Sequence, residues 1–266
     1  MNNIFAYDFM IRAFIAAALI GIIAPCIGTT IVLKRLSAIG DATSHSALAG
    51  IAAGLMTGIH PVLGAVIFSM AAVLGIETVR KTFKNYSEIA TVIIMSAGIG
   101  LTAVLSGFVG NTADLNSFMF GSIVAISDFE MILTVGLSIV VIAVTMLLYR
   151  ELFYIAFDEG AAELAGVPAK TVNIIIMLLT AITVSAASRI VGALMVSSLL
   201  VIPVACAMVI GKSYKSTMII SIVFAELFTV GGLFASFYLD VKPGGSIVLI
   251  GVAVLVILLI FSRRRR

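Results

Sequence analysis

Two side chains that can ligate a metal ion, Asp41 and His45, stand four residues apart in the segment GDATSHSALAG, which runs from Gly40 to Gly50. This spacing puts both side chains on one face of a helix, where they can converge on one ion. Carboxylate oxygen suits manganese, neutral imidazole suits zinc, and a mixed site can accept several first-row metals. The pair therefore predicts a site for a divalent transition metal. The alternative is structural: Asp41 caps a helix start and His45 hydrogen-bonds a backbone carbonyl.

Glu226 is a third ionisable side chain in apolar surroundings, near the middle of the run 216–239. A structural pairing with Arg189 is our first expectation, a protonated carboxyl the second, and metal ligation the last. The two cysteines, Cys26 and Cys206, lie in apolar runs far apart, and we expect reduced, packed thiols.

The elements that carry these residues are membrane spans. Hydrophobic residues make up 62% of the 266 residues and charged residues 11%, and the mean hydropathy is +1.25, which leaves too little polar surface for a water-soluble globule. We expect an all-α, polytopic membrane protein with nine transmembrane helices, or eight as the main alternative. The expected spans cover 13–33, 36–59, 62–79, 89–113, 131–149, 171–188, 190–211, 216–239 and 243–262.

The positive charges indicate the orientation of these spans, because cytoplasmic loops gather Lys and Arg. If the N-terminus is outside, nine spans leave only Arg12, Arg189 and Lys242 on the outer face. We therefore predict an outside N-terminus and a cytoplasmic C-terminus. The last four arginines are then an anchor on anionic head groups rather than a nucleic-acid arm. The thirteen basic residues on the predicted cytoplasmic face are Lys34, Arg35, Arg80, Lys81, Lys84, Arg150, Lys170, Lys212, Lys215, Arg263, Arg264, Arg265 and Arg266.

Two segments depart from the pattern of spans. The apolar run 115–127 is too short to cross a bilayer and suits a re-entrant helix packed within protein. The polar stretch 150–172 predicts a short helix on the cytoplasmic face, which Asp158 and Glu159 start and Gly166 with Pro168 ends. From composition alone, an ordinary amphipathic linker is the favoured alternative for this stretch. No GxxxxGK[ST] loop occurs, so any nucleotide hydrolysis must happen in another polypeptide.

Four segments in order resemble the membrane subunit of bacterial ABC importers for zinc, manganese or iron(II). They are GDATSHSALAG, FDEGAAELAGV, VGALMVSSLLVIPVACA and FYLDVKPGGSIVL. The resemblance covers nearly the whole chain. It implies one permease domain over 1–266 with the fold of vitamin B12 and siderophore importers, in a bacterial plasma membrane.

The resemblance also implies partners and a coupling site. The chain would form a homodimer, a pair of cytoplasmic ATPase subunits would dock on its inner face, and an extracytoplasmic metal-binding protein would deliver cargo. No cofactor would be permanently bound, and the chain itself would not be an enzyme. A coupling helix within 150–170 would insert into the ATPase, and the coupling role falls on Asp158, Glu159, Gly160, Ala161, Glu163, Ala165 and Gly166.

In such a homodimer, two copies of the Asp41 and His45 pair would offer four ligands, enough for a transient metal site. Zinc is slightly ahead of manganese as the expected cargo because of the histidine. The alternative function is an ion-driven or proton-driven secondary metal transporter, but such carriers usually carry internal repeats, and we find none that convinces. A membrane-embedded enzyme would need a clustered set such as HExxH, which does not occur.

Overall fold

The computed structural model describes residues 4, 7–83, 87–123 and 126–263, and within them every regular element is a helix. The helices are α1 (Asp8–Leu33), α2 (Ala38–Thr57), α3 (Pro61–Thr82), α4 (Ser87–Ser106), α5 (Thr112–Phe120), α6 (Asp128–Leu147), α7 (Tyr149–Phe157), α8 (Glu159–Leu164), α9 (Ala169–Ala187), the π-helical turn η2 (Ser188–Gly192), α10 (Ala193–Ile210), α11 (Tyr214–Leu239) and α12 (Pro243–Arg263).

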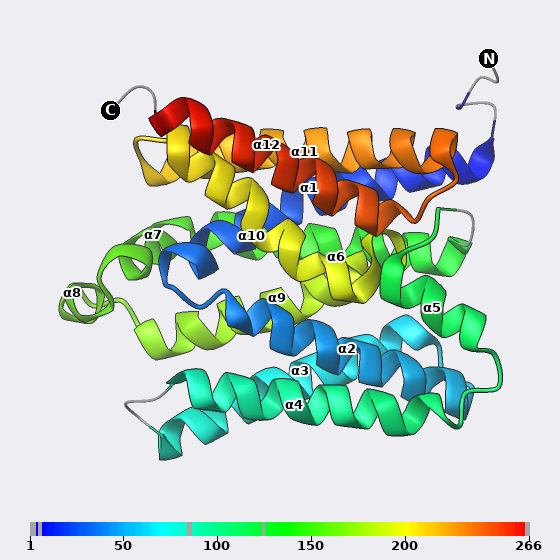
Figure 1. The fold of residues 1–266 in the computed structure, drawn as a ribbon. Helices are drawn as coiled ribbons and strands as arrows, with labels where there is room; N and C mark the ends of the chain where they lie inside the picture. The colour runs from blue at the N-terminus through cyan, green and yellow to red at the C-terminus, as the bar shows by residue number, and fades with distance from the viewer. Residues whose placement is uncertain (1–3, 5–6, 84–86, 124–125, 264–266) are drawn as a thin grey trace.

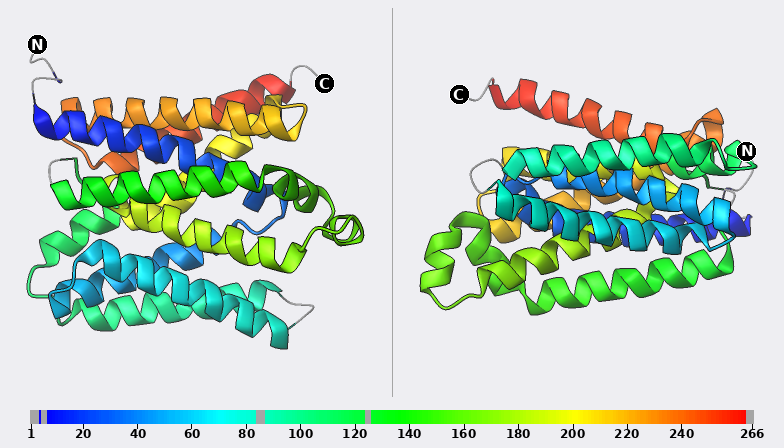
Figure 2. Two further views of the ribbon diagram at one scale, coloured as in Figure 1. Left: turned by 180° about the vertical axis from the view of Figure 1, so that it is seen from behind. Right: turned by 90° about the horizontal axis from the view of Figure 1, so that it is seen from below.

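The long helices run roughly side by side in three layers (Figure 1). One layer holds α1, α11 and α12, the middle layer holds α6, α9 and α10, and the third holds α2, α3 and α4. Short helices mark the two ends of the bundle: α5 lies at the end where α1 starts, and α7 and α8 protrude at the end where α12 stops (Figures 1 and 2). We refer to them as the α5 end and the α8 end.

The expected number of spans can be compared with the helices in the described part of the chain. Seven segments there are long and apolar enough to cross a membrane. One of them, Ala169–Ile210, contains both α9 and α10, which η2 separates. The 20-residue α2 is not among the seven, since polar and small residues lower its hydropathy. The nine predicted spans thus correspond to nine long helices, while length and composition alone identify seven segments.

One predicted boundary is wrong. The span expected over 89–113 ends at Ser106, and the short helix expected over 115–127 is α5, Thr112–Phe120. The cause is local: the Asn111 side chain accepts a hydrogen bond from the Ala113 backbone N–H at 3.1 Å and starts a new helix there. Residues 124–125 of the expected short segment lie outside the described residues.

The alternation of helix directions gathers several basic residues at one end of the bundle. Lys34 and Arg35 follow α1, Arg80 is in the last turn of α3, and Arg150 is in α7, all at the α8 end. At the α5 end, Arg12 pairs with Asp128 at 2.5 Å and joins the starts of α1 and α6. Lys84 and the last three arginines lie outside the described residues.

Close helix contacts use glycine where no side chain fits. At the crossing of α2 and α3, a Cβ on Gly50 or on Gly64 would overlap the backbone of the other glycine. At the last residue of η2, Gly192 has a φ of +91°, and a Cβ there would meet the Gly121 backbone N at 2.6 Å. Both cysteines are free and buried, as predicted.

Candidate functional site

The predicted metal ligands lie on the open face of α2. This helix packs against α3, α4, α9 and α10, which bury most of its residues. Asp41, in its first turn, is exposed, and His45, one turn later, is half-buried. The structure therefore places the two residues one turn apart on the same helix, as their spacing predicted.

Helix α4 fixes the backbone that carries His45. The Thr102 hydroxyl donates its shorter hydrogen bond within α4, to the Gly98 carbonyl oxygen at 2.8 Å, and lies 3.4 Å from the His45 carbonyl oxygen. One turn earlier on α4, a Cβ on Gly98 would lie 2.9 Å from the Ser46 backbone N, so only glycine permits this approach. The backbone of α2 at His45 is thus closely packed against α4.

An open cavity of about 480 Å³ adjoins His45 between α2, α4, α5 and α10. Besides the imidazole, its polar groups are hydroxyls and one amide, and the rest of the lining is mainly apolar. Its lining therefore includes side-chain oxygen atoms between the α5 end and His45. The lining residues are His45, Leu48, Ile99, Thr102, Ala103, Ser106, Thr112, Leu115, Asn116, Met119 and Leu194.

Asp41 and His45 do not form a complete metal site within one chain. Among the described residues, no group of three or more His, Cys, Asp or Glu side chains could hold a metal ion. Two ligands are too few for a closed tetrahedral zinc site or for octahedral manganese coordination. Because Asp41 and His45 face outward, a second chain can reach them.

The expected pairing of Glu226 with Arg189 is wrong. The Arg189 Nε lies 3.3 Å from Glu130 Oε1, and both side chains are largely buried. Glu226 instead lies against α1, where a Cβ on Gly21 would be 2.7 Å from its Oε1, and this oxygen has no hydrogen-bond partner. Arg189 is at the helical turn η2, next to the start of α6, while Glu226 sits within α11.

Arg189 and Glu130 form a junction that the sequence analysis missed. The Arg189 guanidinium lies 4.4 Å from the centroid of the Phe118 ring in α5, and its carbonyl accepts a hydrogen bond from the Ser122 N–H at 3.1 Å. Glu130 also accepts from the Ser127 N–H at 2.8 Å, in a capping box that starts α6. The sequence signal for this capping box is a serine three residues before a glutamate, Ser127 and Glu130.

The predicted coupling stretch is two short helices, α7 and α8. Asp158 starts α8, because its side chain accepts a hydrogen bond from the Ala161 N–H at 3.0 Å, and Gly166 follows its end with a φ of +85°. These are the start and stop signals that the sequence predicted. All seven predicted coupling residues are exposed: Asp158, Glu159, Gly160, Ala161, Glu163, Ala165 and Gly166.

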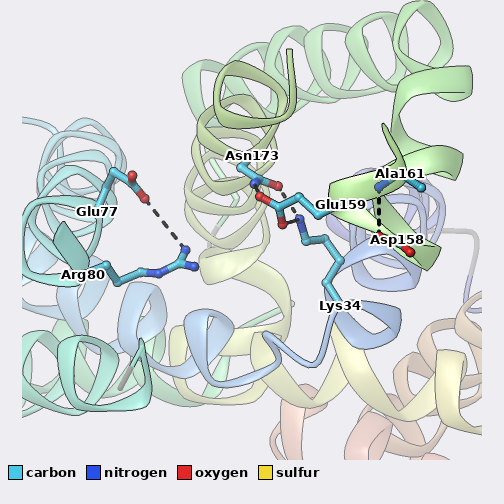
Figure 3. Close-up of polar contacts among 7 residues, drawn as sticks. All are labelled: Lys34, Glu77, Arg80, Asp158, Glu159, Ala161 and Asn173. Carbon is cyan, nitrogen blue, oxygen red and sulfur yellow. Dashed lines mark hydrogen bonds and ion pairs between the residues drawn. The ribbon is translucent and has the colours of Figure 1, made fainter. Parts of the chain in front are cut away.

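Glu159 ties α8 to the bundle (Figure 3). Its carboxylate accepts hydrogen bonds from Lys34 Nζ at 2.9 Å and from Asn173 Nδ2 at 2.7 Å, and Lys34 also donates to Asn173. Arg80, which lies 3.8 Å from Glu77, adds positive charge nearby. Burial would raise the pKa of Glu159, but Lys34, Asn173 and Arg80 together hold that pKa below its ordinary value of 4.5.

Comparison with known proteins agrees with this architecture. The ABC 3 transport family matches residues 6–262. The "probable metal transport system membrane protein" of Treponema pallidum is 35% identical over 259 residues, covering 97% of each chain. The manganese import system permease protein ScaB of Streptococcus parasanguinis is 32% identical, covering 91% of this chain and 87% of that protein.

Solved structures share the fold. PsaBC from Streptococcus pneumoniae, in complex with Fab, aligns with a TM-score of 0.86 and 29% identity, covering 95% of this chain and 91% of that one. A metal-chelate type ABC transporter in an inward-facing conformation aligns with a TM-score of 0.76 at 16% identity, covering 94% and 85%. The match along nearly the whole chain and the shared helical bundle lead to one conclusion. This chain belongs to the ABC 3 transport family and is a multi-pass membrane permease of an ABC transport system.

Proposed function

We propose that the protein is the permease subunit of an ATP-driven importer for a divalent transition metal, with manganese as the leading cargo. The observation that carries the proposal is the pair Asp41 and His45 on α2, of which His45 also lines a cavity of about 480 Å³. The histidine alone favoured zinc. Relatives in Streptococcus and Listeria whose names specify manganese import or transport shift our preference to manganese, with zinc and iron(II) as the next candidates.

A homodimer completes the metal path in this proposal. With the open faces of two α2 helices turned toward each other, two carboxylates and two imidazoles surround one ion. Carboxylate and water ligands satisfy manganese, and the hydroxyl and amide groups of the cavity contact the hydrated ion on its way in. A mixed, open site binds weakly enough to release the ion, as transport requires. Glu226 has the lowest priority as a ligand, since it lies against α1 in a different layer.

ATP hydrolysis takes place in a separate subunit in this proposal, and the permease is not itself an enzyme. The α8 end is cytoplasmic, in keeping with its basic residues, and α8 docks on the ATPase subunits through its exposed residues. An extracytoplasmic metal-binding protein delivers cargo to the α5 end. The N-terminus is then outside and the C-terminus in the cytoplasm.

The test is uptake of radioactive manganese, zinc and iron(II) into vesicles that contain the permease, its ATPase and its binding protein. We expect ATP-dependent manganese uptake, which Asp41→Ala and His45→Ala each abolish while ATP hydrolysis persists. His60→Ala replaces the only other histidine of the chain and serves as the matched control. Uptake that proceeds without ATP would indicate a secondary transporter, and unchanged uptake in both variants would reduce the pair to a structural role.

A further inference from the structure

The coupling helix α8 reaches the rest of the protein through a buried lysine. The Lys34 side chain is only 8% exposed, although it carries a charge, and Glu159 and Asn173 accept its hydrogen bonds. Lys34 is the residue that directly follows α1, Asn173 is in the second turn of α9, and Glu159 is the first residue of α8. One cluster of polar contacts therefore joins three helices at the α8 end (Figure 3).

The chain after Lys34 is a stiff turn. The Leu36 N–H donates to the Ile31 carbonyl at 2.9 Å and the Arg35 N–H donates to the Val32 carbonyl at 3.0 Å, which is the pattern of a Schellman motif. Arg35 supplies the left-handed residue of this motif, with a φ of +58° that few side chains adopt. The backbone hydrogen bonds from Ile39 to Leu36 and from Gly40 to Ser37, both 3.0 Å, then start α2. The link between Lys34 and α2 is thus hydrogen-bonded along its length.

Helix α7 also contacts the last turns of α1. The Phe153 ring of α7 packs edge-on against Tyr214, with centroids 5.7 Å apart. Tyr214 is fully buried, and its hydroxyl shares a 2.9 Å hydrogen bond with Thr30. Both short helices of the coupling stretch are therefore linked to the end of α1, α7 through Tyr214 of α11 and α8 through the ion pair of Glu159 with Lys34.

We propose that Glu159 is a positioning residue, which passes movement of α8 through Lys34 and its turn to the Asp41 and His45 pair on α2. This inference rests on the proposed function. It distinguishes two roles among the side chains of the coupling stretch. Glu159 faces the bundle and transmits movement, whereas the apolar side chains that point outward meet the ATPase. Leu164 at 93% exposed and Phe157 at 65% exposed belong to that outer surface.

The ion pair lends itself to a charge-exchange experiment in the reconstituted transporter. The variants are Glu159→Gln, Glu159→Lys, Lys34→Glu, and the double variant that exchanges the two charges. Lys170→Glu, which reverses an exposed charge at the start of α9, is the matched control. Three quantities are measured: retention of the ATPase subunits, metal taken up per ATP hydrolysed, and the rate at which a cysteine at Ala38 reacts with a thiol reagent with and without nucleotide. Ala38 is exposed at the start of α2, while the two native cysteines are buried.

We expect each single variant at these two positions to retain its ATPase subunits. Uptake per ATP should fall about fivefold, the shift that corresponds to about 1 kcal/mol lost at a partly exposed ion pair. The effect of nucleotide on labelling at Ala38→Cys should shrink in parallel, and the charge exchange should restore both. A merely structural role would lower the amount of folded protein without changing either ratio. Glu159→Gln is the mildest change and keeps the test valid if a charge reversal prevents folding.

Other results would overturn the proposal. Normal uptake per ATP in the single variants would show that the contact transmits nothing. Loss of the ATPase subunits from Glu159→Gln would show that Glu159 docks the partner instead, and failure of the charge exchange would exclude the ion pair as the link. If the wild type takes up no metal with ATP, the proposed function fails, and the nucleotide response at Ala38→Cys still decides whether α8 moves α2.

Discussion

The contact between Arg189 and Glu130 yields a prediction that also tests the corrected pairing of Arg189. Replacing Arg189 by Met removes a guanidinium that is 15% exposed and leaves a Glu130 carboxylate that is 6% exposed. Removal of one partner from a buried ion pair costs 3–5 kcal/mol, roughly. The carboxylate keeps its hydrogen bond from the Ser127 N–H at 2.8 Å, so we expect a loss of about 3 kcal/mol, at the lower end of that range.

A double-mutant cycle separates the pairwise interaction from other effects of each substitution. The free energy of unfolding is measured by detergent titration for the wild type, Arg189→Met, Glu130→Gln and the double variant. We expect a coupling energy of about 2 kcal/mol, the usual size for a hydrogen bond to a charged group. The control cycle pairs Arg189→Met with Glu226→Gln, and its coupling energy should stay below about 0.5 kcal/mol. A control coupling as large as that of Glu130 would refute the pairing, and so would a coupling near zero for Glu130.

Three further predictions concern helix packing and the α8 end. Gly50→Ala pushes a Cβ into the Gly64 carbonyl of α3, so it should lower the free energy of unfolding by about 1–3 kcal/mol and impair uptake. Gly100→Ala, whose Cβ meets nothing within 4 Å, should be tolerated. Asp158→Ala removes the cap of α8 and should lower the free energy of unfolding by about 1 kcal/mol, whereas Asp158→Asn keeps a capping oxygen and should lose little. Equal losses in both variants would exclude capping. Because the pKa of Glu159 is lowered in the folded protein, the stabilisation that this carboxylate provides is complete above pH 4.5 and is lost as the pH falls through the folded-state pKa. The free energy of unfolding, measured as a function of pH, should therefore fall less in that range for Glu159→Gln than for wild type.

The features predicted well from the sequence depend on residues close together in the chain. Asp158 and Gly166 mark the two ends of α8 within nine positions, and hydrophobic runs mark most long helices. The spacing of Asp41 and His45 placed both on one side of α2. Local signals suffice in these cases because helix caps and helix faces are set by neighbours within one or two turns.

The features that were missed depend on which helices pack together. The depth of Glu226 in an apolar run makes it the expected partner of Arg189, yet the fold brings the start of α6 to η2 instead. The contact of Lys34 with Glu159 joins positions 125 residues apart. No periodicity or spacing carries such pairings, since they follow from the arrangement of the three layers. The boundary between α4 and α5 was missed because no charged residue stands between Glu88 and Asp114, so the turn before α5 lies within an uncharged stretch.

The junction at η2 has a consequence for the way the chain enters the membrane during synthesis. The segment Ala169–Ile210 is apolar over 42 residues, and its only charge besides Lys170 at its start is Arg189, which lies near its midpoint. A charged residue there favours a hairpin of two helices with its bend at the membrane surface. Glu130 precedes Arg189 in the chain and is therefore synthesised first, so its carboxylate is already present when the arginine arrives. The negative charge of Glu130 is thus in place before the positive charge of Arg189 enters the membrane.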